Sequence, residues 1–303
     1  MGDQFTIVGL GEALFDIFPD RQVLGGAPLN AAVHAHQLAA VRGGRGVIVS
    51  RLGQDELGKR AQNELTGRSI STEYIQMDPD HSTGKVHVTV DEDGQPDYEI
   101  VEHVAWDWLQ WDPDLEHLAR HCDAVCFSGL AQRQNQTRSS IHRFVTEAAQ
   151  AVRLFDLTLR QHFYDQRMLR HSCELANVVK LNLEELDVLS AQINLPGKSI
   201  DAQIRTLIDT FALNQVVLTR GAEGTVIYTR SRRYEGEPVH YEPAKHADSV
   251  GAGDACTAAI LVGAVLRLPV PKILQLANHA GAYVASVPGA TPTLPATILQ
   301  QLN

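Results

Sequence analysis

The residues best suited to chemistry are Gly251-Ala252-Gly253-Asp254, followed three residues later by an apolar run from Ala258 to Leu268. Glycine and alanine let a backbone approach a ligand closely, and the first N–H groups of a helix have no partner within the helix. Such a helix end attracts an anion, most often a phosphate. Asp254 adds a carboxylate that could accept a proton from an attacking hydroxyl. This stretch therefore predicts phosphoryl transfer.

A simpler interpretation of the same stretch is an ordinary tight turn in which Asp254 only caps the helix. A Walker-type nucleotidase is not indicated, because the Lys-Ser/Thr pair of a P-loop is missing.

A second group of polar residues lies near the N-terminus. Asp16 ends a strand-like segment, and Gly25-Gly26 precede an Ala-rich helix in which Pro28 suits the first turn and Asn30 follows. A carboxylate, bare glycine backbone and an amide suit a polyhydroxylated ligand, since each hydroxyl both donates and accepts. The alternative is a capped helix with a surface Asn. A dinucleotide-binding Gly-x-Gly-x-x-Gly is not formed, because position 14 is Leu.

The elements that must position these groups follow one another regularly. Apolar strand-like runs alternate with amphipathic helical stretches, which predicts one α/β domain over residues 1–303, with a mostly parallel sheet and helices on both faces. The predicted strands are 5–11, 46–52, 124–128, 152–157, 178–181 and 216–219, and the clearest predicted helices are 27–41, 55–67, 137–151 and 200–213.

Residues 71–104 depart from this alternation. They contain strand patterns only, at 72–77, 85–90 and 98–104, with a turn at Asp91-Glu92-Asp93-Gly94. We predict a small antiparallel sheet made by about 12–24 and 71–104, called the lid below. It either covers a cleft or is a decorative edge hairpin.

Composition limits the class of protein. The chain has 303 residues, 44% of them hydrophobic, and a formal net charge of −10. An acidic chain of this kind argues against nucleic acid or an anionic membrane as partner. Its four cysteines form no evident disulfide framework, and we expect no secretory leader or membrane span, so we predict a cytoplasmic protein.

Motifs in a fixed order resemble the ribokinase-like (PfkB-type) carbohydrate kinases, most closely the bacterial fructokinases. The first pair is Gly11-Glu12-Ala13-Leu14-x-Asp16 and Gly25-Gly26-Ala27-Pro28-x-Asn30. The remaining motifs are Arg51-Leu52-Gly53-Gln54-Asp55, Asp156-Leu157-Thr158-Leu159-Arg160, Lys180-Leu181-Asn182-x-x-Glu185, Thr219-Arg220-Gly221-x-x-Gly224, Gly251-Ala252-Gly253-Asp254 and Gly289-Ala290-Thr291-Pro292.

The resemblance implies a ribokinase-like fold and transfer of the γ-phosphoryl group of ATP to a sugar hydroxyl, with fructose as the first candidate. Ribose, a sugar acid or a nucleoside are alternative acceptors, and a non-catalytic sugar- or nucleotide-binding protein is the alternative from another class. A homodimer through the lid is also implied.

Roles for individual residues follow from the same resemblance. Asp254 would be the catalytic base, the amides of Gly251, Ala252 and Gly253 would hold developing charge, and Arg160 would reach the phosphate. The sugar would contact Asp16, Gly25, Gly26 and Asn30, and the nucleotide Thr219, Gly221, Gly224 and Asn278. Asn182 and Glu185 would organise Mg²⁺ through water, and Asp248 with the carbonyls of Val250 and Gly289 would form a K⁺ site.

This chain departs from the family pattern in four places. Thr158 stands where Asn is usual, and Ser249-Val250 replace the commoner residues of the K⁺ loop. The lid lacks the Arg that fructokinases carry, and Glu99 or His103 is the candidate replacement that contacts the sugar. Trp106 either stacks on a sugar face or packs a helix onto the sheet.

Overall fold

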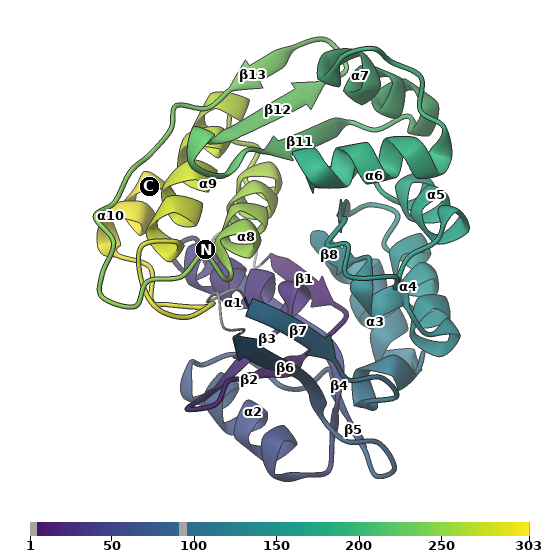
Figure 1. The fold of residues 1–303 in the computed structure, drawn as a ribbon, viewed down its shortest axis with the longest axis vertical. Coiled ribbons are helices and arrows are strands. Elements are labelled where there is room, and N and C mark those ends of the chain that lie inside the picture. The colour runs from purple at the N-terminus through teal and green to yellow at the C-terminus, as the bar shows by residue number, and fades with distance from the viewer. Residues whose placement is uncertain (1–4, 91–95, 303) are drawn as a thin grey trace.

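The computed structural model describes residues 5–90 and 96–302, which contain a large and a small sheet (Figure 1). The strand order of the large sheet is β13-β12-β11-β10-β9-β8-β1-β4-β5. Neighbouring strands from β11 to β5 are parallel, and β12 and β13 add an antiparallel edge. The strands are β1 (Thr6–Leu10), β4 (Arg45–Gly53), β5 (Ile75–Asp78), β8 (Ala124–Ser128), β9 (Val152–Asp156), β10 (Val178–Asn182), β11 (Gln215–Thr219), β12 (Thr225–Thr229) and β13 (Arg233–Glu235).

Helices cover both faces of the large sheet, as the alternation in the sequence predicts. One face packs against α3 (Pro113–His121), α4 (Asn135–Glu147), α5 (Gln166–Leu175), α6 (Leu183–Ile193) and α7 (Ile200–Phe211). The other packs against α1 (Ala27–Ala40), α8 (Ala252–Val265), α9 (Val270–Val284) and α10 (Ala296–Leu299). Burial on both faces explains why the strands are nearly continuous apolar runs. The predicted mostly parallel α/β architecture is confirmed.

The small sheet has the order β3-β2-β6-β7, with β2 (Leu14–Ile17), β3 (Gln22–Gly25), β6 (Gly84–Val90) and β7 (Pro96–Ile100). In Figure 1 it lies beside β1 and β4, at the opposite end of the molecule from β12 and β13. It corresponds to the predicted lid, but it is not wholly antiparallel, because β2 and β6 run parallel. The predicted turn at residues 91–94 lies outside the described residues.

One predicted lid strand belongs elsewhere. The segment expected at 72–77 is β5, which pairs with β4 in the large sheet. The reason is the length of β4: its first half pairs with β1, whereas Ser50 to Gly53 extend beyond β1 and pair with β5.

Packing fixes the lid to the body on both sides. Phe15 and Leu24 pack with α2 (Glu56–Gly67) and β4, whereas Leu14, Val86 and Ile100 pack with residues of two short 3₁₀ helices, η1 (Ala105–Trp108) and η2 (Leu130–Gln132). Two further 3₁₀ helices are η3 (Gly221–Glu223) and η4 (Gln300–Leu302). Within 5–90 and 96–302, no helix has both the length and the apolar character needed to cross a bilayer.

Candidate active site

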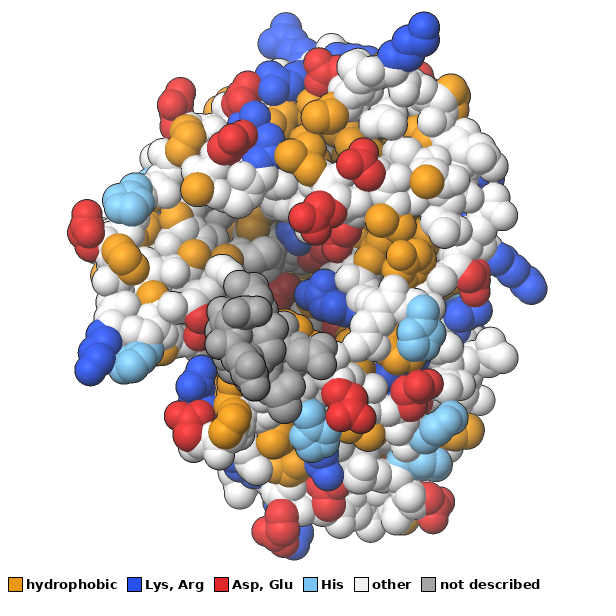
Figure 2. Space-filling view, in the orientation of Figure 1, with side chains coloured by type: hydrophobic (Ala, Val, Ile, Leu, Met, Phe, Trp, Pro, Cys, Tyr) orange, Lys and Arg blue, Asp and Glu red, His pale blue; other side chains and the backbone are white. Residues whose placement is uncertain are grey.

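The candidate site lies where the parallel strands of the large sheet end. The carboxyl ends of β1, β8, β9, β10 and β11 meet at one edge, because these strands share one direction. Ligand sites of open α/β sheets are found at this edge. The space-filling view shows a hollow between the two ends of the molecule, with Asp/Glu and Lys/Arg side chains on its walls (Figure 2). We call this hollow the cleft.

Helix α8 presents its N-terminus at this edge. It begins at Ala252, earlier than the apolar run alone indicates, with Gly251 as its N-cap at φ 81°. A Cβ on Gly251 would lie 2.1 Å from the carbonyl oxygen of Ala290, so both the left-handed backbone and the close contact require glycine. The amide of Ala252 donates to the carbonyl of Ser249 at 3.2 Å, whereas the amides of Gly253 and Asp254 make no backbone hydrogen bond among the described residues, so these two N–H groups can bind an anion.

The carboxylate of Asp254 stands in this first turn of α8. Its Oδ2 accepts a hydrogen bond of 2.8 Å from Nδ2 of Asn30, which lies in α1, 224 residues away. Burial raises the pKa of Asp254 to about 6, the charge of Asp156 adds to the rise, and the Asn30 hydrogen bond opposes it. Asp254 is thus ionised at pH 7, but with a higher pKa than an ordinary Asp.

The polar residues of the N-terminal group come together at the same place. Burial raises the pKa of Asp16 to about 6, while the positive charge of Arg160 lowers it and the charge of Asp248 raises it. A Cβ on Gly25 would come within 3.3 Å of Asp16 Oδ2, and one on Gly26 within 2.4 Å of the Glu12 carbonyl oxygen. Both glycines therefore leave room at the start of α1.

The side chain of Glu12 fixes the N-terminus of α1, a role that was not predicted from the sequence. Its side chain accepts hydrogen bonds from the Ser128 hydroxyl (2.6 Å) and from the amide of Ala27 (3.1 Å). It is only 1% exposed, and burial raises its pKa to about 7. A glutamate directly after an apolar strand is the signal that could have revealed it.

Two predicted sugar contacts do not face the cleft in this structure. Trp106 is 1% exposed and packs with Leu14, Val86 and Ile100, with the guanidinium of Arg133 4.0 Å above its ring. The packing alternative for Trp106 is therefore the one realised. Asp16 pairs with Val86 and Glu99 pairs with His87, the next residue of β6. Because side chains alternate along a strand, Glu99 points to the face of the small sheet opposite the one that carries Asp16.

A buried ion pair lies beneath the N-terminus of α8. Nζ of Lys180 donates to both carboxylate oxygens of Asp156, at 3.0 and 2.8 Å, and the Thr257 hydroxyl donates to Oδ2 at 2.8 Å. A Cβ on Gly253 would lie 3.5 Å from that Nζ. Burial disfavours the charged form of Lys180, but Asp156 outweighs it and the pKa of Lys180 is raised.

No role was predicted for this pair. An Asp at the end of β9 and a Lys in the middle of the mostly apolar β10 were the available signals. The ammonium group of Lys180, paired with the Asp156 carboxylate, lies next to the backbone that would bind phosphate.

Asn182 and Glu185 cap α6 reciprocally. Asn182 Oδ1 accepts from the Glu185 amide (2.8 Å), and Glu185 Oε2 accepts from the Asn182 amide (3.0 Å). Burial and the charge of Asp156 raise the pKa of Glu185. Such a carboxylate would be stabilised in its ionised form by a divalent cation, so the residues fit an ion that is held mainly by water and phosphate.

Arg160 lies in the loop that follows β9. Its positive charge lowers the pKa of both Asp16 and Asp254. The side chain is exposed, and Nη1 donates to the adjacent carbonyl of Leu159 at 3.0 Å.

Thr158, in the same loop, adopts φ 41°, a left-handed conformation. This conformation is unfavourable for a β-branched residue but is tolerated by Asn. We therefore expect Thr158→Asn to increase the free energy of unfolding by about 1 kcal/mol, as measured by urea denaturation. The control is Thr206→Asn in the regular helix α7, which should not stabilise the protein. No gain for Thr158→Asn would show that the loop imposes no strain on Thr158.

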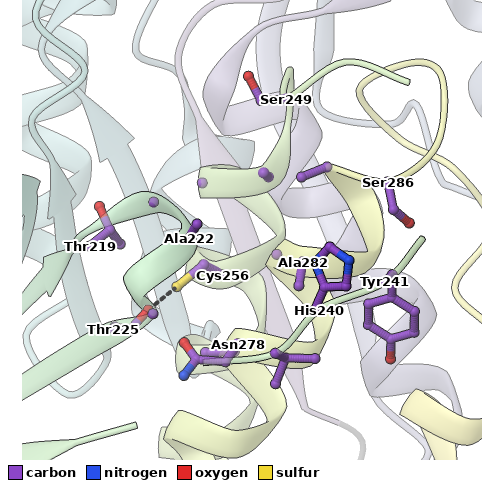
Figure 3. Close-up of a pocket in the computed structure, with 18 of the residues that line it drawn as sticks. Thr219, Ala222, Thr225, His240, Tyr241, Ser249, Cys256, Asn278, Ala282 and Ser286 are labelled. Atoms are coloured by element: carbon purple, nitrogen blue, oxygen red, sulfur yellow. Dashed lines mark hydrogen bonds between the residues drawn. The ribbon is translucent and has the colours of Figure 1, made fainter. Parts of the chain in front are cut away.

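The predicted nucleotide residues line one cavity of about 540 Å³ beside the N-terminus of α8. Thr219, Gly221, Gly224 and Asn278 of α9 all line it. In Figure 3 Thr219 lies on the left of the cavity and Asn278 below it. Asn278 Nδ2 donates to the carbonyl of Glu237 at 2.8 Å. His240 and Tyr241 form the wall opposite Thr219 in this view, and the sequence analysis did not identify them.

The three predicted K⁺ residues are neighbours in the structure. Asp248 Oδ1 accepts from the amide of Val250 (3.1 Å), and Oδ2 accepts from the amide of Gly289 (3.4 Å). The carboxylate is thus held by two backbone amides, and its remaining lone pairs fit a monovalent cation. A second cavity, of about 430 Å³, lies between these residues and Asp16.

Comparison with known proteins agrees with this geometry. Residues 19–297 match the model of the pfkB family carbohydrate kinases. A fructokinase of Escherichia coli is 28% identical, with 94% of this chain and 95% of the relative covered. A probable fructokinase-4 of Arabidopsis thaliana is 27% identical, with 97% and 95% covered.

Solved structures show the same fold. A double mutant of the Vibrio cholerae fructokinase, with fructose, ADP and potassium ion bound, has a TM-score of 0.81 and 25% identity, with 99% of both chains covered. A Xylella fastidiosa fructokinase with bound ATP has a TM-score of 0.83 and 23% identity, with 98% of this chain and 97% of that chain covered. Since the family match spans most of the chain, this protein belongs to the pfkB family of carbohydrate kinases, phosphotransferases whose acceptor is a sugar hydroxyl.

Proposed function

We propose that this carbohydrate kinase transfers the γ-phosphoryl group of ATP to a hydroxyl of fructose. The observation that carries the proposal is the carboxylate of Asp254, which stands in the first turn of α8 and is held by Asn30 at 2.8 Å. One group can thus accept the proton of a hydroxyl while the adjacent backbone amides bind the phosphoryl oxygens.

The phosphate would be bound by the amides of Gly251 and Gly253, with Arg160 on the cleft side and Lys180 beneath. The amide of Ala252, predicted for the same role, donates instead to the carbonyl of Ser249 at 3.2 Å. Preorganised donors of this kind stabilise the charge that develops in the transition state. Mg²⁺ bound near Glu185 would neutralise phosphate charge. The nucleotide would occupy the cavity beside α8, with its base toward Asn278.

The acceptor would be bound by Asp16, Asn30 and the backbone of Gly25 and Gly26. Asn30 Oδ1 is buried without a hydrogen-bond partner, and a sugar hydroxyl would supply the missing donor. Asp16 and Asp254 both carry negative charge here, which favours an uncharged sugar over a sugar acid. The fructokinase relatives, one of them solved with fructose bound, support fructose.

We further propose a homodimer through the lid and a cytoplasmic location. Tyr98 on β7 is 47% exposed, so its ring offers a contact surface for a second copy. The four cysteines are buried and unpaired, which suits a reducing compartment. Sedimentation of the purified protein would test the dimer.

The proposed function is tested by measuring ADP release from Mg-ATP with fructose, ribose, a sugar acid and a nucleoside, each with and without K⁺. We expect fructose to give kcat/KM of about 10⁴ M⁻¹s⁻¹ or more. Turnover with another acceptor would change the substrate assigned to this cleft. Binding of fructose or ATP without turnover would instead support a binding protein.

The pH dependence of kcat/KM should show an acidic limb near pH 6. The base must be ionised, and the pKa values of Asp254 and Asp16 are both raised to about 6, so activity falls as the pH drops below this value. Glu12→Gln is the control, because Glu12 titrates near 7. If the limb disappears in Glu12→Gln, it belongs to Glu12 and not to the base.

A further inference from the structure

The loop that carries Arg160 also contacts the lid, through the next residue. Nε2 of Gln161 donates a hydrogen bond of 2.7 Å to the carbonyl oxygen of Tyr98 in β7, 63 residues away. β7 is an edge strand of the lid, so this bond attaches its free side to the body. Arg133 makes a similar contact to the carbonyl of Val101, just after β7, at 2.7 Å.

The backbone of the loop is held under strain at this contact. Gln161 adopts φ 48°, and the amide of Phe163 donates to the carbonyl of Arg160 at 3.1 Å, which closes a turn around Gln161. A left-handed conformation is costly for a residue other than glycine and persists only where its surroundings impose it. The contact with the lid is one such restraint.

On its other side, the loop is attached to Glu185, one of the two residues that would organise Mg²⁺. The amide of Leu159 donates to Glu185 Oε1 at 3.2 Å. Arg160 therefore lies between a restraint on the magnesium side and a restraint on the lid. Its own side chain hydrogen-bonds only to the adjacent Leu159 carbonyl among the described residues, so the loop backbone decides where the guanidinium points.

We propose that Gln161 is a positioning residue that couples the lid to Arg160. When the lid is seated, the Gln161–Tyr98 hydrogen bond fixes the loop, and the guanidinium is directed toward the space between Asp16 and Asp254. When the Gln161–Tyr98 bond is lost, Arg160 is no longer held there. The lid thereby controls the phosphoryl end of the cleft as well as the sugar end. This inference rests on the proposed kinase function.

The test is a double-mutant cycle of Gln161→Ala and Arg160→Ala, with kcat and the KM for fructose and ATP measured for each variant. Gln161→Ala should lower kcat about 3- to 10-fold, the size expected for one lost hydrogen bond, and change KM little. In the Arg160→Ala background the same substitution should have no further effect on kcat. A role limited to stability would not produce this non-additivity.

The control is Gln76→Ala. Gln76 donates a bond of the same 2.7 Å length to the carbonyl of Gln110, and its side chain also bonds Asp112, Arg51 and the Gln110 amide. The loss of these bonds should leave kcat unchanged. Equal effects of Gln161→Ala in both backgrounds, or no effect in either, would overturn the inference while leaving the kinase assignment intact.

Hydrogen exchange provides a measurement that does not depend on turnover. Fructose should slow exchange of the amides at 158–163 in the wild type but not in Gln161→Ala. If the slowing is the same in both proteins, or if it is absent from the wild type, the loop is not coupled to the lid through Gln161. Absence of any turnover in the wild type, in contrast, would contradict the proposed function.

Discussion

Replacement of Asp254 by Asn should reduce kcat by about 10²- to 10⁴-fold, the usual contribution of a general base. The substitution preserves the shape of the side chain, and the oxygen of the new amide can still accept the 2.8 Å hydrogen bond from Asn30. The site should therefore keep its geometry and lose only the group that accepts the proton. We expect the KM for fructose and for ATP to change by no more than a few fold.

The measurement is steady-state ADP release, accompanied by calorimetric binding of fructose and of ATP. The control is Asp187→Asn, which makes the same chemical change at an exposed position of α6 and should retain wild-type kinetics. If Asp254→Asn turns over near the wild-type rate, the base is another group. If it no longer binds fructose, Asp254 contributes to acceptor binding as well as to proton transfer.

Replacement of Lys180 by Met should lower the free energy of unfolding by about 3–5 kcal/mol, because it leaves the buried carboxylate of Asp156 without its counter-ion. Lys180 is 6% exposed and Asp156 is 4% exposed, so water cannot easily replace the lost ammonium group. We also expect kcat to fall, because the positive charge beneath Gly253 is removed.

The Asp156→Asn/Lys180→Met double variant separates charge from packing. It removes both charges, and the new amide oxygen can still accept from Thr257. Its loss of stability, measured by urea denaturation, should be smaller than that of Lys180→Met alone. If Lys180→Met is as stable as the wild type, the pair is not an essential part of the folded core. A stable double variant with reduced kcat would assign Lys180 to the phosphate site.

These results would connect the site to the two parts of the fold that build it. Asn30 and Glu12 come from the N-terminal segments next to the lid, whereas Asp254 and Lys180 come from the centre of the large sheet and α8. The hydrogen bond between Asn30 and Asp254 joins the two parts at the expected position of the reacting hydroxyl. In the proposed mechanism, acceptor binding by Asn30 and proton removal by Asp254 would therefore be coupled by a direct contact.

Much of this protein was determined by the sequence alone. The order of strands and helices follows from local apolar patterns, and all six predicted strands of the large sheet agree with the structure to within one residue at each end. β4 begins one residue earlier than predicted, at Arg45, and ends one residue later, at Gly53. The glycines and the acid that begin α8 could likewise be recognised, since an N-cap and the first turn of a helix depend on adjacent residues.

Strand pairing, side-chain direction and burial depend on contacts between distant residues, so only the tertiary structure shows them. The assignment of Ile75–Asp78 to the large sheet depends on the length of its neighbour β4, and the side to which Glu99 points depends on strand register. Trp106 is buried because the lid packs against it.

The electrostatics of the site were also decided by the tertiary structure. The Lys180–Asp156–Thr257 contacts join β9, β10 and α8, and the raised pKa of Asp254 arises from burial and from Asp156, about a hundred residues away. Local sequence patterns report which element a residue belongs to. Burial and charge at a site are sums over neighbours that only the folded chain brings together.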